Sequence, residues 1–203
     1  ELWAFLHPMI EISIRHLIPT LPSSYNPHML RLILLALALA LSACSDAPKW
    51  QGVNLTGASF GKDFSLADAD GKTRTLAEFK GSAVMIFFGF TQCPDICPTA
   101  LGRAVEVKKL LGADGNKVQV IFITVDPERD TPKLLREYTA AFDPSFIALR
   151  GDADATKRTA DEFRVFYQKN VTGSSYTMDH TALSYIYDVN GKIRLAEIGR
   201  AHV

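Results

Sequence analysis

One stretch constrains this chain more than any other: residues 88–98, FGFTQCPDICP, in which Cys93 and Cys97 stand four positions apart. An apolar run over residues 83–90 leads into it, and a helix-like run over residues 99–111 leads away. This order predicts a buried strand, a tight loop and a helix with Pro98 at its first position and Cys97 at or next to its N-cap. The dipole of a helix N-terminus can lower the pKa of a thiol from about 8.5 to roughly 3.5–7.5. The sequence therefore places two activated sulfurs at the carboxyl end of a strand, where open α/β sheets bind ligands.

The remaining elements alternate between strands and helices. A continuous apolar run at 83–88 is typical of a strand buried on both faces. Asn190-Gly191 marks a hairpin turn between two strands, and Thr131-Pro132 fits the start of a helix. The order predicts an α/β class and a thioredoxin-like fold, with a central, mostly parallel sheet, an antiparallel edge and flanking helices. Residues 170–179 are expected to form a loop. The expected strands cover 64–66, 73–76, 83–88, 117–125, 146–149, 182–189 and 192–196, and the expected helices cover 99–111, 131–142 and 152–166.

The chain before residue 59 does not have the pattern of a folded domain. Residues 1–28 are rich in proline and lack a sustained period, and we interpret them as non-native sequence upstream of a start at Met29. Residues 29–43 have the basic start, apolar run and small-residue end of a signal peptide, with a run shorter than the about 20 residues of a membrane span. The end of this segment, LSAC, resembles a bacterial lipobox. It predicts lipidation of Cys44 and a polar tether over 44–58, and a plain signal anchor is the alternative.

The C-terminal residues 197–203 have neither a period nor a helix cap. They match the translation of a common sequencing adapter, and we interpret them as an artefactual tail that replaces the natural C-terminus. Closing a sheet of this kind needs one more helix, so we expect the natural chain to continue past Ala196. The folded, metal-binding domain is accordingly expected to cover 59–196.

Composition excludes two classes of protein. The chain has 22 basic and 22 acidic residues, so no net field favours nucleic acid, and no nucleic-acid partner is expected. Its three cysteines are too few for a disulfide-stapled scaffold, and a core of this size needs no staples.

The two cysteines of the CxxxC motif can do one of three things. They can form a structural disulfide, exchange with other thiols, or bind a soft metal. General thiol–disulfide oxidoreductases of this fold have two residues between the cysteines and a cis-proline opposite them. Here three residues intervene and no proline follows Pro144, which weakens that interpretation.

His180 supplies a third candidate ligand. It lies just before the strand expected at 182–189, a junction that faces the dithiol loop in a thioredoxin-like fold. Two thiolates and one imidazole suit copper, whereas structural zinc needs four protein ligands. A histidine that only caps the strand is the alternative. Met178 could add a thioether, but we expect it to pack in the core.

Residues 125–132, VDPERDTP, follow a central strand at the same rim as the cysteines. Asp126 could orient His180 or act as a hydrogen-bond acceptor behind the ligands. For Asp130 and Thr131 we expect a turn and a helix cap. Arg129 could pair with Asp126 or Asp130 on the surface.

Three motifs in order, GFTQCPDICP at 89–98, VDPERDT at 125–131 and DHT at 179–181, resemble those of the Sco/SenC family of copper chaperones. The resemblance covers about residues 53–196. It implies that Cys93, Cys97 and His180 are the metal ligands for Cu(I) or Cu(II), and that the two cysteines form a disulfide when oxidised. It also implies delivery of copper to the binuclear site of cytochrome c oxidase subunit II, or reduction of the cysteines there.

Two functions stay open: a metallochaperone without turnover, and a thiol–disulfide reductase that prepares the oxidase cysteines. A peroxiredoxin-type peroxidase is disfavoured because its single cysteine needs no histidine opposite. An upstream periplasmic copper donor or thiol reductase would be a further partner. A bacterial member would work in the cell envelope, membrane-anchored and facing the periplasm or the cell exterior, which agrees with a lipid on Cys44.

Overall fold

The computed structural model describes residues 28–29, 31–33 and 52–198. The chain divides into two units, 1–48 and 49–203, of which the first contributes a few helical residues and the second the folded domain. The upstream segment, Cys44, most of the signal peptide and tether, and residues 199–203 lie outside the described residues. Within the described part, no helix is long and apolar enough to span a membrane.

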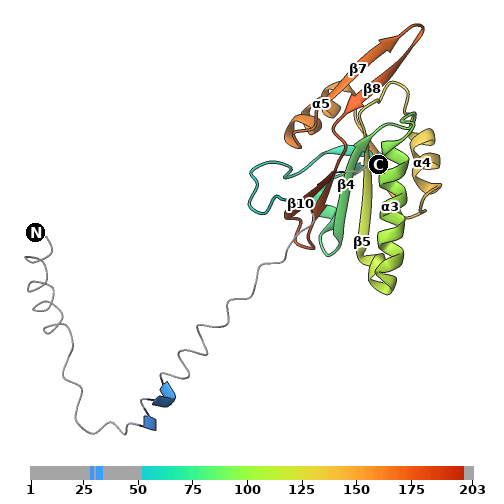
Figure 1. Ribbon diagram of the computed structural model, residues 1–203. Helices are drawn as coiled ribbons and strands as arrows, with labels where there is room; N and C mark the ends of the chain where they lie inside the picture. Colours follow the sequence, from blue (N-terminus) through green and yellow to red (C-terminus); the bar gives the residue numbers. More distant parts are fainter. Residues whose placement is uncertain (1–27, 30, 34–51, 199–203) are drawn as a thin grey trace, which may run out of the picture. The chain divides into compact units, whose positions relative to one another are not determined.

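The domain is built on one eight-stranded sheet (Figure 1). Only its three central strands are parallel, and every other pairing is antiparallel. The α/β class is therefore confirmed, but the parallel part is smaller than expected, because hairpins flank the helical crossovers on both sides. The strand order is β1 (Val53–Asn54), β10 (Ile193–Ile198), β9 (Leu183–Tyr187), β4 (Ala83–Gly89), β5 (Val118–Thr124), β6 (Ile147–Arg150), β2 (Leu66–Asp68) and β3 (Thr73–Arg74).

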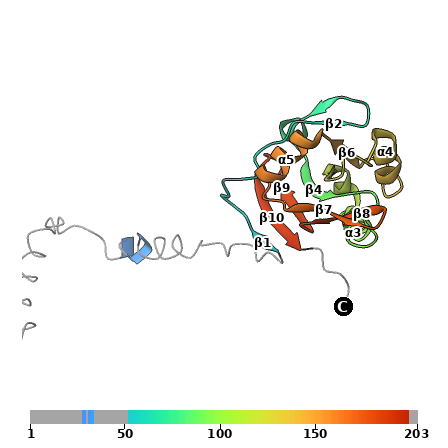
Figure 2. The same ribbon diagram turned by 90° about the horizontal axis from the view of Figure 1, so that it is seen from above.

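Helices cover both faces of this sheet. α3 (Ile96–Leu110) and α4 (Pro132–Ala140) lie on one face and α5 (Ala153–Glu162) lies on the other, as the view from above in Figure 2 shows. Thr131 caps α4 and Asp152 caps α5, each by accepting a backbone N–H with its side chain. Two short 3₁₀ helices, η1 (Leu76–Phe79) and η2 (Gly112–Lys117), precede β4 and β5. The phenylalanines of β4 and β5 are buried between the layers.

The expected loop at 170–179 is wrong. This segment belongs to a two-stranded antiparallel sheet, β7 (Tyr167–Thr172) and β8 (Ser175–His180), which projects from the domain in Figure 1. The turn contains Gly173 with φ +60°, a conformation that favours glycine. β7 is mostly polar and exposed and lacks the alternating apolar pattern by which a half-buried strand is recognised. In β8, Tyr176 and Met178 do alternate with exposed polar residues, a short signal that the loop prediction missed.

Two element boundaries also differ from the sequence prediction. α3 begins at Ile96 with Asp95 as its N-cap, so Cys97 and Pro98 are its second and third residues rather than the N-cap and the first. β10 does not break at Ala196 but continues to Ile198, with Glu197 opposite Ser184 of β9. The origin of residues 197–203 and the continuation of the natural chain stay predictions.

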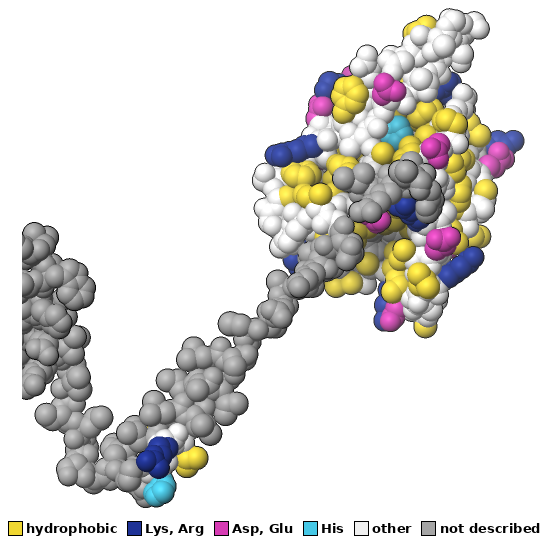
Figure 3. All heavy atoms as spheres, viewed as in Figure 1, with side chains coloured by type: hydrophobic (Ala, Val, Ile, Leu, Met, Phe, Trp, Pro, Cys, Tyr) yellow, Lys and Arg dark blue, Asp and Glu magenta, His cyan; other side chains and the backbone are white. Residues whose placement is uncertain are grey.

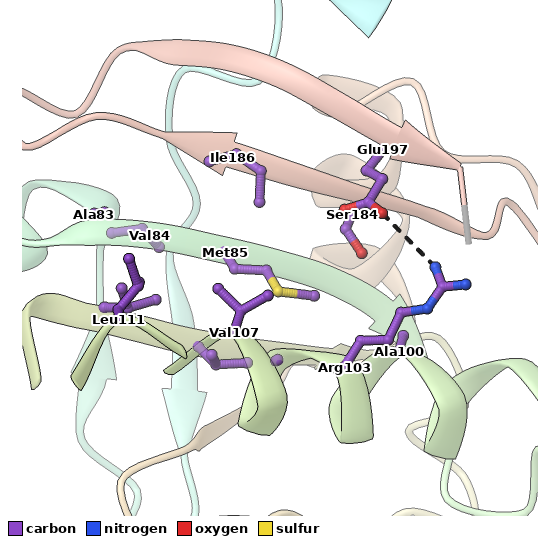
Figure 4. Close-up of a pocket in the computed structure, with 13 residues that line it drawn as sticks. Ala83, Val84, Met85, Ala100, Arg103, Val107, Leu111, Ser184, Ile186 and Glu197 are labelled. Atoms are coloured by element: carbon purple, nitrogen blue, oxygen red, sulfur yellow. Dashed lines mark ion pairs between the residues drawn. The ribbon is translucent and has the colours of Figure 1, made fainter. Parts of the chain in front are cut away.

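An apolar groove of about 300 Å³ lies between α3 and the adjoining face of β4 and β9 (Figure 4). Met85, Val107 and Ile186 line it, and an ion pair of 3.7 Å between Arg103 and Glu197 closes one end. Hydrophobic side chains reach the surface along α3 in Figure 3. No cysteine or histidine lines this groove, so the reactive groups lie elsewhere.

Candidate metal centre

Three elements bring the predicted ligands together. Cys93 lies in the loop after β4, Cys97 lies in the first turn of α3, and His180 is the last residue of β8. The two sulfurs and a ring nitrogen of His180 all lie within 4.8 Å of one another. Among the described residues, this is the one group of three or more His, Cys, Asp or Glu side chains close enough to hold a metal ion.

Both sulfurs are withdrawn from solvent and unbridged. Cys93 is 9% exposed and Cys97 is fully buried, and both are free thiols. The backbone N–H of Cys97 donates to the Sγ of Cys93 at 3.4 Å, and the Sγ of Cys97 lies 3.5 Å from Nε2 of His180. Each sulfur therefore touches a second member of the triad.

The helix start makes the two thiols chemically different. A hydrogen bond from the Cys97 thiol, followed by the His180 ring and the backbone N–H groups of Cys97 and Asp95, lowers the pKa of Cys93 to about 4, although burial opposes the shift. Burial and the neighbouring Cys93 sulfur raise the pKa of Cys97. The reduced apo site thus holds one thiolate and one thiol, so of the two sulfurs that the dipole argument predicted to be activated, only Cys93 has a lowered pKa.

The His180 ring is fixed with Nε2 toward the cysteines. Its Nδ1 lies 3.2 Å from the backbone carbonyl of Thr181. A carbonyl oxygen only accepts, so in the tautomer in which Nδ1 donates to it, Nε2 keeps its lone pair for a ligand. Phe87 and Phe90 meet the ring edge-on, with centroids 6.0 and 5.8 Å away. Aromatic packing and one hydrogen bond therefore set the ring's orientation.

A glycine makes room for the buried sulfur. Gly89 ends β4, and a Cβ built there would lie 2.6 Å from the Sγ of Cys97 and 2.9 Å from Cε2 of Phe122. Real Cβ contacts are not this short, so this position accepts no side chain unless the sulfur or the ring moves. Sequence reasoning missed this requirement, because the glycine is not in a positive-φ turn.

The two aspartates of the VDPERDT motif are both buried hydrogen-bond acceptors, and neither contacts the ligands' side chains through a hydrogen bond in the described part of the chain. Asp126 is buried, but its side chain bonds Arg129 and Tyr176, and no hydrogen bond to His180 is found in the described part of the chain. It does not orient the imidazole directly. Its pairing with Arg129 was expected on the surface, yet the aspartate is only 3% exposed.

Asp130 is more than the turn residue that the sequence indicated. It is fully buried and accepts hydrogen bonds from the backbone N–H of Thr91 at 3.1 Å, the Thr91 hydroxyl at 2.5 Å and the Thr124 hydroxyl at 2.6 Å. It therefore ties the start of the cysteine loop to the end of β5. Burial raises its pKa, against the effect of these donors. Met178 is 8% exposed within the core, as expected for packing.

Comparison with known proteins places this geometry in a family. The family model described as SCO1/SenC matches residues 53–196. The chain belongs to the SCO1/SenC family. An SCO2-like protein of Rickettsia felis is 43% identical over 136 residues, which cover 65% of this chain and 66% of that protein. The match thus spans just under two thirds of that relative's length.

Solved structures of the family show the same fold. Bradyrhizobium japonicum ScoI with copper bound is 42% identical, with a TM-score of 0.65 over 70% of this chain and 92% of that one. BsSco, described as a Sco cytochrome c oxidase assembly protein with a disulfide switch, is 25% identical, with a TM-score of 0.57 over 77% and 90%. The mixed α/β sheet is therefore the Sco variant of the thioredoxin-like fold.

The donor set in this SCO1/SenC member suits copper. Thiolates select Cu(I), and imidazole binds both Cu(I) and Cu(II). Three side chains fall one short of the four ligands of structural zinc. The described residues therefore fit the metal bound in the solved relative.

Proposed function

We propose that this protein binds one copper ion as cargo through Cys93, Cys97 and His180 and delivers it to the binuclear copper site of cytochrome c oxidase subunit II. The observation that carries the proposal is the convergence of two sulfurs and one imidazole nitrogen within 4.8 Å. Membership of the SCO1/SenC family supports it, as does the copper-bound state of a relative that is 42% identical.

The residues around the site prepare it for capture and release. The Cys93 thiolate is available without a base, and Cys97 gives up its proton when copper arrives, so binding releases a proton. The His180 ring presents Nε2 because Nδ1 is held by the Thr181 carbonyl. Oxidation of the two thiols to a disulfide removes both sulfur ligands and prevents binding.

A second candidate function is reduction of the oxidase cysteines. A thiolate at Cys93 next to the Cys97 thiol is the arrangement that attacks a target disulfide. The Cys93 sulfur would form a mixed disulfide with one target sulfur. The Cys97 sulfur would then attack the Cys93 sulfur and release the target sulfur. The target gains two electrons and the one proton of the Cys97 thiol, a second proton comes from solvent, and Cys93 and Cys97 become a disulfide.

Transfer to the acceptor separates the two functions. The copper-loaded chain would be mixed under anaerobic conditions with the soluble domain of subunit II, either reduced or with its copper-site cysteines oxidised. Appearance of the binuclear copper spectrum in the reduced acceptor supports the chaperone. Loss of the acceptor's disulfide, without metal transfer, supports the reductase. Neither change, with folded partners, would contradict both.

The site of action is part of the proposal. A lipid on Cys44, after removal of residues 29–43, would hold the domain on the cell envelope membrane, facing the periplasm or the cell exterior, where an upstream copper donor or thiol reductase could reach it. The sequence LSAC supports this anchor. Replacing Cys44 by Ser is expected to move the protein from the membrane to the soluble fraction. Retention in the membrane at the wild-type level would contradict lipid anchoring.

A further inference from the structure

The loop between β5 and α4 faces both halves of the candidate metal centre. On one side Asp130 holds the start of the cysteine loop through Thr91. On the other side Arg129 reaches the hairpin that ends in His180. A single short segment therefore contacts both the element that carries the thiols and the element that carries the imidazole.

Arg129 is the centre of these contacts. Its Nη1 donates to the side-chain oxygen of Gln92 in the cysteine loop at 3.0 Å and to the backbone carbonyl of Tyr176 in β8 at 2.8 Å. Its Nε bonds the buried Asp126 at 2.5 Å, and the Tyr176 hydroxyl donates to the same carboxylate at 2.9 Å. The guanidinium carbon lies 3.6 Å from the centroid of the Tyr176 ring. We name these four residues, Gln92, Asp126, Arg129 and Tyr176, the arginine clasp.

The hairpin needs such a clasp because the main sheet does not hold it. β7 and β8 form a separate two-stranded sheet, and isolated two-stranded hairpins are marginally stable in water. Near His180, one reciprocal contact secures the base of the hairpin: the N–H of Thr181 donates to the Phe166 carbonyl at 2.9 Å, and the N–H of Phe166 donates to the Thr181 hydroxyl at 3.0 Å. Tyr176 lies about 13 Å farther along β8, at about 3.3 Å per residue. Met178 of β8 also packs in the core, and the clasp adds a hydrogen-bonded attachment farther out at Tyr176.

We propose that Arg129 is a positioning residue for the metal centre: it fixes β8 against the cysteine loop and thereby sets the position of His180 relative to Cys93 and Cys97. The proposal rests on copper binding as the proposed function. Arginine suits the task because its planar fork can hold Gln92, Asp126 and the Tyr176 carbonyl at once. Lysine keeps the charge but presents a single nitrogen, so it cannot make all three contacts.

The same loop and hairpin offer a matched control. Lys169 of β7 pairs with Glu128 at 2.6 Å, but their side chains are 40% and 66% exposed. Exposed ion pairs of this kind contribute little. Lys169 also lies over the Tyr176 ring, 4.0 Å from its centroid, so the control is made at the other partner of the pair. Glu128→Gln removes this hairpin-to-loop ion pair and leaves the clasp contacts in place, whereas Arg129→Lys removes the clasp while keeping the charge.

The test measures copper and motion separately. Copper stoichiometry, affinity and dissociation rate would be measured for wild type, Arg129→Lys, Tyr176→Phe and Glu128→Gln. Hydrogen exchange of β8 would be followed in the reduced, metal-free proteins. Arg129→Lys is expected to keep about one copper per chain, to weaken affinity about tenfold through faster dissociation, and to change the thiolate-to-Cu(II) absorption, because supporting groups behind ligands typically affect metal affinity by 10–100-fold. Exchange of β8 is expected to accelerate in this variant.

The other variants sharpen the comparison. Tyr176→Phe loses one hydrogen bond of the clasp and keeps the ring. We therefore expect smaller changes in copper affinity, copper dissociation and β8 exchange, in the same direction as in Arg129→Lys. This variant serves as the test if Arg129→Lys fails to fold. Glu128→Gln is expected to match wild type within twofold. Wild-type affinity, dissociation and β8 exchange in Arg129→Lys would overturn the proposal, as would an equal effect in Glu128→Gln. Wild-type protein without copper would refute the proposed function instead, and exchange in the metal-free proteins would still decide whether Arg129 holds β8.

Discussion

Replacing Gly89 by Ala tests whether the packing around Cys97 is as tight as the structure indicates. The new methyl group would lie 2.6 Å from the Sγ of Cys97 and 2.9 Å from Cε2 of Phe122. Non-bonded heavy atoms rest about 3.5–4.0 Å apart, so the sulfur or the ring must move by about 1 Å. Overpacking of this kind costs about 1–3 kcal/mol, and each kcal/mol lowers Tm by roughly 2–4 °C in a domain of this size. We expect Tm to fall by about 2–12 °C.

Gly102→Ala is the matched control. Gly102 lies within α3, and a Cβ at this position meets nothing within 4 Å. Because glycine in a helix interior is about 1 kcal/mol less favourable than alanine, this variant is expected to gain up to about 2–4 °C in Tm. The two glycine-to-alanine changes should therefore shift the transition in opposite directions.

The assay is thermal unfolding of the reduced, metal-free variants, followed by copper titration against a competing chelator. If Gly89→Ala adds about 1.4 kcal/mol of strain to the copper-bound state beyond the strain in the metal-free state, the dissociation constant for copper rises about tenfold. Gly102→Ala should keep the wild-type value. A Gly89→Ala protein with wild-type Tm and copper affinity would refute the packing argument.

Two further predictions concern titrating groups. In the reduced, metal-free protein, the alkylation rate of Cys93 should stay flat between pH about 6 and about 8, because a pKa of about 4 keeps its sulfur ionised. A rate that rises about tenfold per pH unit, as for an ordinary thiol, would contradict this. Burial raises the pKa of Asp130, so the folded protein holds that proton more tightly than the unfolded chain, and the contribution to stability is present at low pH and lost as pH rises through the folded pKa. Urea unfolding should therefore show wild type losing stability relative to Asp130→Asn as pH rises above the ordinary aspartate pKa of 3.8, and a constant difference would count against it.

The sequence predicted the elements that carry strong local signals. The apolar run of β4, the cap at Thr131 and the Asn190-Gly191 turn each depend on nearby residues, and all were found where expected. The approach of His180 to the cysteines was predicted because a thioredoxin-like topology brings that junction to the dithiol loop.

What the sequence did not reveal depends on contacts between distant segments. β7 is mostly polar and exposed, and the alternation of Tyr176 and Met178 with polar residues in β8 is short, so neither strand was predicted from the sequence. The arginine clasp joins residues 92 and 176 through Arg129. Asp130 looked like an ordinary turn residue because its partner Thr91 lies 39 positions away. The additional helix expected after Ala196 stays a prediction.

The central claim, that Cys93, Cys97 and His180 bind copper, is tested most directly by measuring the number of copper ions bound per chain. The full chain would be reduced and loaded with copper without oxygen, and metal per chain would be measured for wild type, Cys93→Ala, His180→Ala and Met178→Leu. The account predicts about one copper in wild type and Met178→Leu and strong loss in Cys93→Ala and His180→Ala. Copper retained in folded His180→Ala at the wild-type level and affinity would contradict the Cys–Cys–His site, and no copper in folded, reduced wild type would contradict copper binding itself.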